Sequence, residues 1–399
     1  MRRGGSEQAQ STQGLRYFSP STLAAAYVGV MAVAVQNVAP ALAGVLHLSL
    51  GWSGREIGTY AAADALGIFV GGLLAAGAMT LGSFRALALA GMSVLGISDL
   101  LSGLSSSPAL LIGERLIGGL GGGVALGISF SVFAASHPER DIAIWSVGQL
   151  AFSLVGISAM PVLAAALHWP GPLFTLAALT VPAIVLARYL PTTQRPLGTT
   201  SPVTQTRVGS IGVLGIMSVA LFYFGQGSLW PHLEVLGLRS GITQKSVETS
   251  LSLSAVTALL GSIFVLVAGT RFGRKLPLLG AFALTLAALF SLDATQPQVF
   301  RIALAAFTFA WPVFGAYQFA IIARSSASTR IGALISAATF AGSSLGPVLA
   351  GIISDRAGFG EVLWLAAALD CVALACLLPL LRKAAWDGAS CAADTIERT

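Results

Sequence analysis

A charged pair lies inside a long apolar stretch of the sequence. Residues 108–134 are almost entirely apolar, and about 20 such residues suffice to cross a bilayer. Glu114 and Arg115 interrupt this stretch in its first third. A charge at that depth costs about 2.5–3.5 kcal/mol on insertion scales, so it normally faces a polar pathway or a buried partner. These two residues are therefore the first candidates for a functional site.

Arg115 could act directly in a transport cycle. Its guanidinium could hold an anionic or polar substrate, or respond to protonation of a neighbouring acid. The alternative is a structural hydrogen bond to backbone or polar groups of the first helix. Glu114 points about 100° away from Arg115 on a helix, so we expect it to face a different helix. The glycines of residues 118–123 predict a neighbour packed closely against this helix.

Two carboxylates in other apolar stretches are candidates for proton binding. Asp64 lies in the middle of residues 54–79, and Asp370 lies at a similar depth in residues 359–381. An isolated carboxylate there must be either protonated or paired. We therefore interpret Asp64 as a candidate proton site, with a packing role against a neighbouring helix as the alternative.

Uncharged polar and aromatic side chains complete the candidates for solute binding. Amides at membrane depth suit a polar ligand, but such residues also bond between helices. Aromatic residues beside mid-helix prolines could line a site for a flat apolar solute, or could equally face lipid or the core. The candidates are Gln36, Asn37, Tyr223, Gln226, Trp311, Tyr317 and Gln318.

Twelve apolar stretches must position these residues. The chain has 399 residues, of which 55% are hydrophobic and 10% charged, whereas a soluble domain has about 25% charged residues. This composition excludes an ordinary soluble enzyme, and continuous apolar runs exclude a membrane β-barrel, which needs alternation. The predicted helices are 21–46, 54–79, 86–104, 108–134, 141–166, 171–190, 209–235, 246–270, 276–294, 298–323, 331–354 and 359–381.

The longest polar break divides the chain into two halves. We expect two six-helix bundles, residues 21–190 and 209–382, joined by a linker at residues 191–208. Most Lys and Arg residues fall on the side of the chain termini, which predicts a multi-pass inner-membrane protein with cytoplasmic tails at residues 1–20 and 383–399.

The two halves also carry similar residues at a nearly constant spacing. Two pairs are 189 residues apart and two are 186 apart, which suggests an internal repeat. Many secondary transporters are built from such repeats, with the substrate site between them. The pairs are Asn37 and Gln226, Arg85 and Arg274, Arg115 and Arg301, and Pro161 and Pro347.

In these features the chain resembles a member of the major facilitator superfamily of transporters. Arg115 followed by Gly119 resembles the Arg-containing signature of the family's fourth helix. Gly346 and Pro347 in the eleventh helix are similar to the Gly-Pro bend that family exporters carry in their fifth helix. The fifth helix itself keeps Pro161 but has methionine in place of the usual glycine. The resemblance covers roughly residues 20–382 and implies an all-α fold of twelve membrane helices in two pseudo-symmetric bundles.

The family's gating loops are matched in part. After the second helix, Gly77 and Arg85 fit the family pattern, but Leu81 and Gly82 replace its Asp and Arg. The equivalent loop after the eighth helix has Thr270 in place of the Asp. The resemblance therefore implies an incomplete charge latch in both halves. The gating candidates are Gly77, Arg85, Pro161, Arg271, Gly273, Arg274, Lys275, Gly346 and Pro347.

Together these features predict a secondary active transporter that moves a small organic molecule by alternating access. We expect proton-coupled efflux of an amphipathic or aromatic compound; the alternatives are uptake of an organic acid by proton symport, or a polytopic membrane protein that transports nothing. A phosphate-binding loop and a catalytic cluster are both missing from the sequence, so an enzyme is not expected. The expected partners are the solute, protons and the lipid bilayer, with no cofactor, metal or nucleic acid, and the expected state is a monomer.

Overall fold

The apolar stretches fold into helices, which satisfy every backbone N–H and C=O within one segment in lipid. The computed structural model describes residues 19–52, 54–79, 82–192, 208–230, 233, 236–237, 241–326, 328 and 330–396. The expected N-terminal tail to residue 18 and linker residues 193–207 lie outside this description. Of the described helices, nine are long and apolar enough to cross a bilayer, and three apolar helices are shorter.

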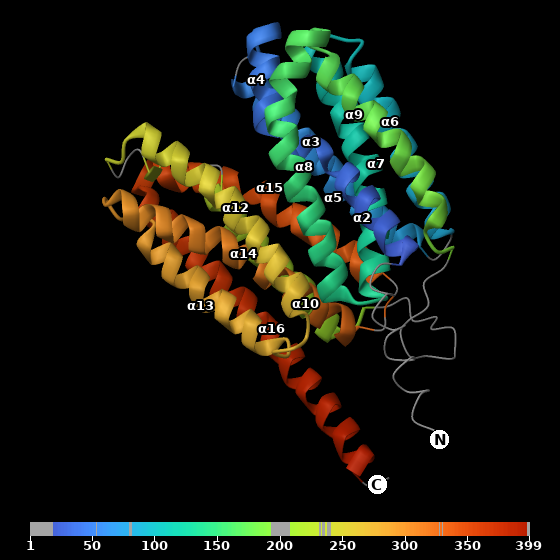
Figure 1. Ribbon diagram of the computed structural model, residues 1–399, viewed down its shortest axis with the longest axis vertical. Helices are drawn as coiled ribbons and strands as arrows, with labels where there is room; N and C mark the ends of the chain where they lie inside the picture. Colours follow the sequence, from blue (N-terminus) through green and yellow to red (C-terminus); the bar gives the residue numbers. More distant parts are fainter. Residues whose placement is uncertain are drawn as a thin grey trace, which may run out of the picture.

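The N-terminal half forms one bundle (Figure 1). Its first span is broken at Val33 and Val38, whose φ angles of −119° and −111° with ψ near zero leave the helical region. Pro40 follows the second break and has no N–H for the helical ladder. The elements are α2 (Pro20–Ala32), α3 (Ala34–Asn37), α4 (Ala39–Leu50), α5 (Gly54–Ala78), α6 (Phe84–Ser102), α7 (Pro108–Ala134), α8 (Pro138–Leu167), α9 (Gly171–Leu186) and the short 3₁₀ helix η1 (Ala187–Tyr189).

The C-terminal half forms the second bundle. Counting α2–α4 as one span and α9 with η1 as another, the described helices account for all twelve predicted spans. The last helix continues past the predicted end at residue 381. The elements are α10 (Ser210–Leu229), α12 (Gln244–Ala268), α13 (Lys275–Ser291), α14 (Pro297–Ser325), α15 (Ile331–Ala357) and α16 (Phe359–Ile396).

Glycines bring α5 and α7 into backbone contact, as the glycine-rich stretch predicted. A Cβ atom on Gly119 would lie 2.4 Å from the carbonyl oxygen of Asp64, and one on Gly123 would lie 2.2 Å from that of Ile68. Both distances are far below van der Waals contact, so the two helices can approach this closely only without side chains at these positions.

The two bundles meet at one end, where α8 and α15 begin; we call it the closed end. A Cβ atom on Gly332 of α15 would lie 2.4 Å from the backbone nitrogen of Ser131 on α7. Further along, a Cβ atom on Gly72 of α5 would lie 3.1 Å from that of Ala337 on α15. From this end the ribbons of the two bundles diverge (Figure 1).

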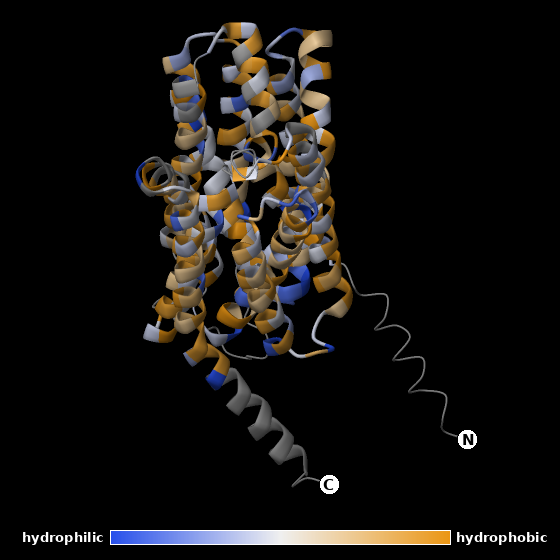
Figure 2. Ribbon diagram, turned by 90° about the vertical axis from the view of Figure 1, so that its left-hand side faces the viewer, coloured by the Kyte–Doolittle hydropathy of each residue, from blue (hydrophilic) through white to orange (hydrophobic). Residues whose placement is uncertain are grey.

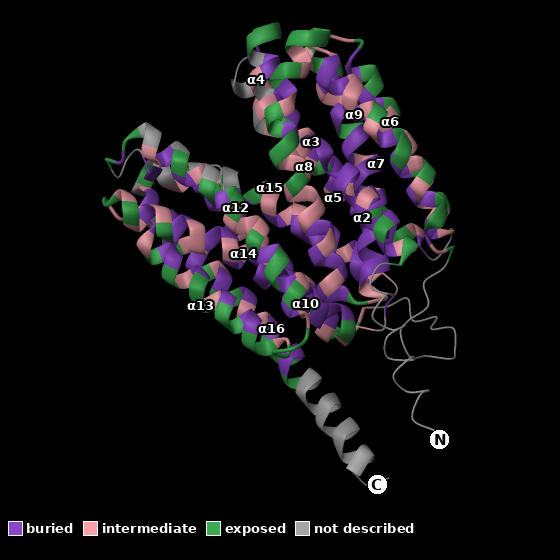
Figure 3. Cartoon of the chain, viewed as in Figure 1, coloured by how far each residue is buried: buried purple, intermediate pink, exposed green. Residues whose placement is uncertain are grey.

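Apolar residues cover much of the outside of the helices (Figure 2). Large apolar side chains stay exposed, among them Val155 on α8 and Trp364 on α16, at 69% and 62% exposure. Buried residues line the inside of each bundle and the region where the bundles cross (Figure 3). This distribution is that of a multi-pass membrane protein.

Candidate functional site

A buried cluster of three charged residues lies inside the N-terminal bundle. Arg115 on α7 places its Nε 2.7 Å from Oδ1 of Asp64 on α5, and its Nη1 2.5 Å from Oδ1 of Asp99 on α6. The three side chains are exposed by 4% or less. We call this arrangement the charged triad. It unites three helices through one guanidinium, whose planar fork can serve two carboxylates at once.

Polar neighbours complete the surroundings of the triad. The side chain of Gln36, beside the break between α3 and α4, hydrogen-bonds Asp64. The buried hydroxyl of Tyr60 lies close to Arg115. With both carboxylates ionised, the triad has one negative charge in excess. Because an uncompensated buried charge is costly, the arrangement favours the uptake of one proton or cation.

The sequence analysis singled out two members of this triad and missed the third. Asp99 lies three residues before the end of α6, where a carboxylate normally reaches water, so the sequence alone offered no reason to select it. A role for Arg115 in binding substrate between the two halves would require its side chain to face the space between the bundles. Instead it faces the interior of its own bundle, because both of its carboxylate partners are there.

The other N-terminal candidates lie around the triad without joining it. Glu114 accepts a hydrogen bond through its backbone oxygen from the hydroxyl of Ser98 on α6, and its Oε2 is buried without a described partner. Asn37 accepts a hydrogen bond at its backbone oxygen from Ser153 Oγ on α8, at 2.7 Å, and its Nδ2 is likewise buried without a described partner.

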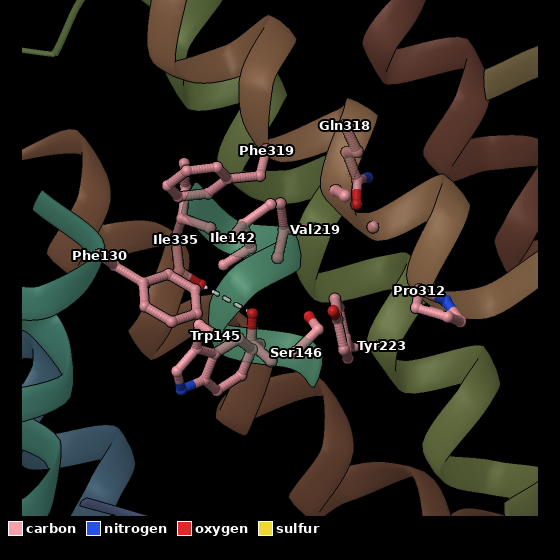
Figure 4. A pocket seen from close by; sticks show the side chains of 13 residues that line it. Phe130, Ile142, Trp145, Ser146, Val219, Tyr223, Pro312, Gln318, Phe319 and Ile335 are labelled. Carbon is pink, nitrogen blue, oxygen red and sulfur yellow. Dashed lines mark hydrogen bonds between the residues drawn. The ribbon is translucent and has the colours of Figure 1, made fainter. Parts of the chain in front are cut away.

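A small pocket with a cavity volume of about 30 Å³ lies between the bundles (Figure 4), close to the closed end. The N-terminal bundle contributes residues of α7 and α8, and the C-terminal bundle contributes residues of α10, α14 and α15. None of the described residues that line it is charged. They are Phe130, Ile142, Trp145, Ser146, Val219, Tyr223, Pro312, Gly315, Ala316, Gln318, Phe319, Ile335 and Thr339.

Aromatic rings form one wall of the pocket across the boundary between bundles. The centroid of the Phe130 ring on α7 lies 5.0 Å from that of Trp145 on α8 and 5.4 Å from that of Phe319 on α14, both edge to face. Figure 4 shows these rings on one side of the pocket and Tyr223 and Gln318 on the other. The sequence analysis missed all three rings, because an aromatic residue in an apolar helix has the same local pattern whether it faces a pocket, the core or lipid.

Of the five C-terminal sequence candidates, two line this pocket and three lie elsewhere. Tyr223 and Gln318 are lining residues. Trp311 lies behind Tyr223, with ring centroids 6.2 Å apart, and hydrogen-bonds to it. Tyr317 is buried away from the pocket, because its hydroxyl donates to the carbonyl oxygen of Gly269 at 2.7 Å. Gln226 belongs to a separate contact with α16.

That contact is a pair of buried polar side chains in the C-terminal bundle. Nε2 of Gln226 on α10 lies 3.4 Å from Oδ1 and 3.3 Å from Oδ2 of Asp370 on α16. Both residues are fully buried, at 1% and 0% exposure. Asp370 was expected at membrane depth, and its partner is an amide rather than a cation.

At the closed end an ion pair joins the two bundles. Nη2 of Arg274, directly before α13, lies 3.0 Å from Oε1 of Glu139 in the first turn of α8. We call this pair the latch. The preceding Gly273 has φ +67°, a left-handed conformation that glycine adopts without strain. The sequence analysis did not select Glu139, because acidic residues are common in the first turn of a helix, where they interact favourably with the helix dipole.

The repeat counterpart of Arg274 makes no such bridge. Arg85 donates from Nε and Nη2 to the carbonyl oxygen of Leu190, at 3.2 and 3.1 Å, within its own bundle. Arg271 and Lys275 flank the latch and are exposed. Gly77 is exposed in the last turn of α5.

The candidates for helix bending lie on α8 and α15. Pro161 is exposed within α8. Gly346 packs α15 onto α10, since a Cβ atom there would lie 2.5 Å from the backbone nitrogen of Ser228. Pro347 belongs to α15, but its side chain lies outside the described residues.

Comparisons with known proteins agree with this architecture. The sequence model described as "Major Facilitator Superfamily" matches residues 24–218 and 215–390. No curated protein sequence matches the chain significantly. Among solved structures, the E. coli fucose:proton symporter FucP in its outward conformation is similar, with a TM-score of 0.74, 15% identity, and coverage of 91% of this chain and 99% of FucP.

Two further structures show the same fold. The proton:xylose symporter XylE bound to 6-bromo-6-deoxy-D-glucose has a TM-score of 0.69 and 14% identity, with 90% of this chain and 94% of XylE covered. The human organic anion transporter MFSD10 has a TM-score of 0.68 and 15% identity, with 90% and 99% covered.

Proposed function

Since the chain belongs to the Major Facilitator Superfamily of transporters, we propose that it is a secondary active transporter that moves a small organic molecule between its two bundles by alternating access. The observation that supports this most directly is the pocket, which is lined from both bundles and lies next to the latch. A solute bound there would contact both halves. Movement of one half against the other would then expose it to either side of the membrane.

The lining of the pocket favours an amphipathic or aromatic solute. The rings of Phe130, Trp145 and Phe319 provide apolar faces and edges, and Ser146 and Gln318 provide uncharged hydrogen-bonding groups. Aromatic contacts of this kind contribute about 0.5–1.5 kcal/mol each beyond the buried area. A strongly charged solute would leave its charge unpaired among the described lining residues, which is costly.

Proton coupling is supported by the charged triad. One guanidinium and two carboxylates leave one negative charge to be neutralised, and a proton on Asp64 or Asp99 does this without a further ligand. The break between α3 and α4 brings Gln36 to Asp64, which links the triad to a helix that can bend. A proton gained or lost here would change how α5, α6 and α7 are held together.

The position of the basic residues supports an orientation of the chain in the membrane, and the chemistry of the solute supports a direction of transport. The latch and the exposed Arg271 and Lys275 gather basic residues at the closed end, which would make that end cytoplasmic in an inner membrane. The structure would then be the outward-facing state. Amphipathic aromatic compounds enter cells through lipid unaided, so active transport of them is useful as efflux. One chain provides both walls of the pocket, which supports a monomer.

Reconstitution tests this function. The protein is placed in liposomes containing a pH-sensitive dye, and aromatic amphiphiles are compared with fucose, xylose and organic anions under an imposed proton gradient. We expect transport of the aromatic solutes to be accompanied by proton movement across the membrane. The variants Asp64→Asn and Arg115→Ala should abolish this proton movement. Transport of sugars alone would overturn the proposed solute class. Unchanged proton movement in both variants would overturn the role of the triad.

A further inference from the structure

The buried pair of Gln226 and Asp370 is not explained by transport through the pocket. Asp370 has no exposed surface, and its described electrostatic neighbourhood contains a single hydrogen-bonding side chain, that of Gln226. Gly225 packs directly on this carboxyl, since a Cβ atom there would lie 3.0 Å from Oδ1 of Asp370. Among the described residues of α10, α13, α14 and α15, which pack against α16, no charged group interacts with Asp370.

The hydrogen bonds of this pair are incomplete if Asp370 is ionised. The amide nitrogen of Gln226 contacts both carboxyl oxygens, yet its own Oε1 is buried without a described partner. An ionised carboxyl has no donor to offer to Oε1, and it leaves an unpaired charge in an apolar bundle. A protonated carboxyl has one O–H group, which could donate to Oε1 while Nε2 donates to the other oxygen. One proton on Asp370 would thus give Oε1 of Gln226 a donor and remove the unpaired charge.

We propose that Asp370 is a proton-binding site that stays occupied, and that the neutral acid forms a cyclic pair of hydrogen bonds with the Gln226 amide. The pair clamps α10 to α16 and so positions Tyr223, one turn before Gln226 on the pocket wall. A second polar link lies on the same interface. Gln318 donates to Ser218 Oγ at 2.7 Å, and Ser218 donates to the carbonyl oxygen of Ala373 at 2.6 Å.

This role differs from that of the charged triad. Asp64 and Asp99 share a cation and can exchange a proton against it, whereas Asp370 has only a neutral partner among the described residues. The acid of Asp370 is therefore a positioning residue. Asparagine, the neutral isostere, should preserve the pairing, because its side chain offers one donor and one acceptor to the Gln226 amide.

Infrared spectroscopy of the purified, full-length protein tests the occupied proton directly. The difference spectrum of wild type minus Asp370→Asn should contain the carbonyl band of a protonated carboxylic acid, shifted in heavy water and unchanged across the neutral pH range. Gln226→Leu should move this band to higher frequency, because the acid loses its amide partner. The matched control is Asp293→Asn, at an exposed carboxyl, and it should leave the band in place.

Stability and transport provide the second readout. Asp370→Asn should retain the thermal unfolding temperature and solute transport of the wild type, whereas Asp370→Ala should lower both. Absence of the acid band, or its loss on moderate rise in pH, would overturn the proposal. So would loss of transport in a well-folded Asp370→Asn protein, because that result requires an exchanging proton. The band does not depend on any solute, so it distinguishes this proposal from failure of the proposed function.

Discussion

Arg274 and Glu139 connect the two bundles at the closed end, with Nη2 3.0 Å from Oε1, while the equivalent arginine of the other repeat, Arg85, bonds within its own bundle to Leu190. The charge latch is therefore asymmetric. Only one half of the repeat contributes an arginine that bridges the described parts of the two bundles. A single partly exposed ion pair would make the closed state easy to release.

The first prediction concerns this latch. Glu139→Gln should shift the equilibrium toward opening of the closed end, because the ion pair exists only while the two bundles are together. The arginine is 28% exposed, so we expect an effect of about 1 kcal/mol or less, a change in population of up to about fivefold. Distances between spin labels on α8 and α13 would report it. Exchange of both charges, Glu139→Arg with Arg274→Glu, should restore the wild-type distribution; failure to do so would contradict a direct pair.

The second prediction concerns the charged triad. Asp64→Asn or Asp99→Asn leaves one carboxylate against one guanidinium, so the site no longer needs a proton. We expect proton movement to be lost while solute exchange across a liposome membrane without a gradient is retained. Arg115→Ala is different, because it leaves two buried carboxylates without a cation, at a cost of about 3–5 kcal/mol. That variant should show reduced thermal stability, and a fully stable Arg115→Ala protein would contradict the buried pairing.

The third prediction concerns the contact between α5 and α7. Gly119→Ala would place a methyl group 2.4 Å from a backbone oxygen, so the helices must separate, at a cost of about 1–3 kcal/mol. The matched control is Gly113→Ala on the same helix, where the added carbon would meet no described atom of another helix within 4 Å. Because alanine favours a helix over glycine, the control should be neutral or slightly stabilising. Thermal unfolding in detergent measures both, and equal stability of the two variants would contradict the packing argument.

The fourth prediction concerns the pocket. Trp145→Ala should weaken binding of aromatic solutes about tenfold, since an aromatic contact contributes about 0.5–1.5 kcal/mol beyond its buried area. Trp364→Ala is the control, because this tryptophan is 62% exposed on the outer face of α16. Equilibrium binding of a radiolabelled aromatic solute compares the two. Equal affinity in both variants would place the solute outside the pocket between the bundles.

The sequence alone determined the helices and the family. The length of an apolar run is a local property, and the bilayer imposes its thickness on every span, so each of the twelve predicted spans corresponds to a described helix or pair of helices. The largest difference in bounds is at the last helix, which continues to Ile396 instead of ending at residue 381. The same reasoning required a partner for Arg115, because a lone charge at that depth is too costly. The glycines of residues 118–123 likewise predicted a closely packed neighbouring helix, and on one face of α7 this neighbour is α5.

The tertiary structure alone decided which partners these residues have. Asp99 and Glu139 are ordinary helix-end acids in the sequence, and they became pairing residues only through the packing of α6 on α7 and of one bundle on the other. The pocket depended on packing for the same reason. Phe130, Trp145 and Phe319 come from three helices, and no local pattern distinguishes an aromatic ring that faces a pocket from one that faces lipid. Their orientation is set by the way the helices cross, which is a property of the whole chain.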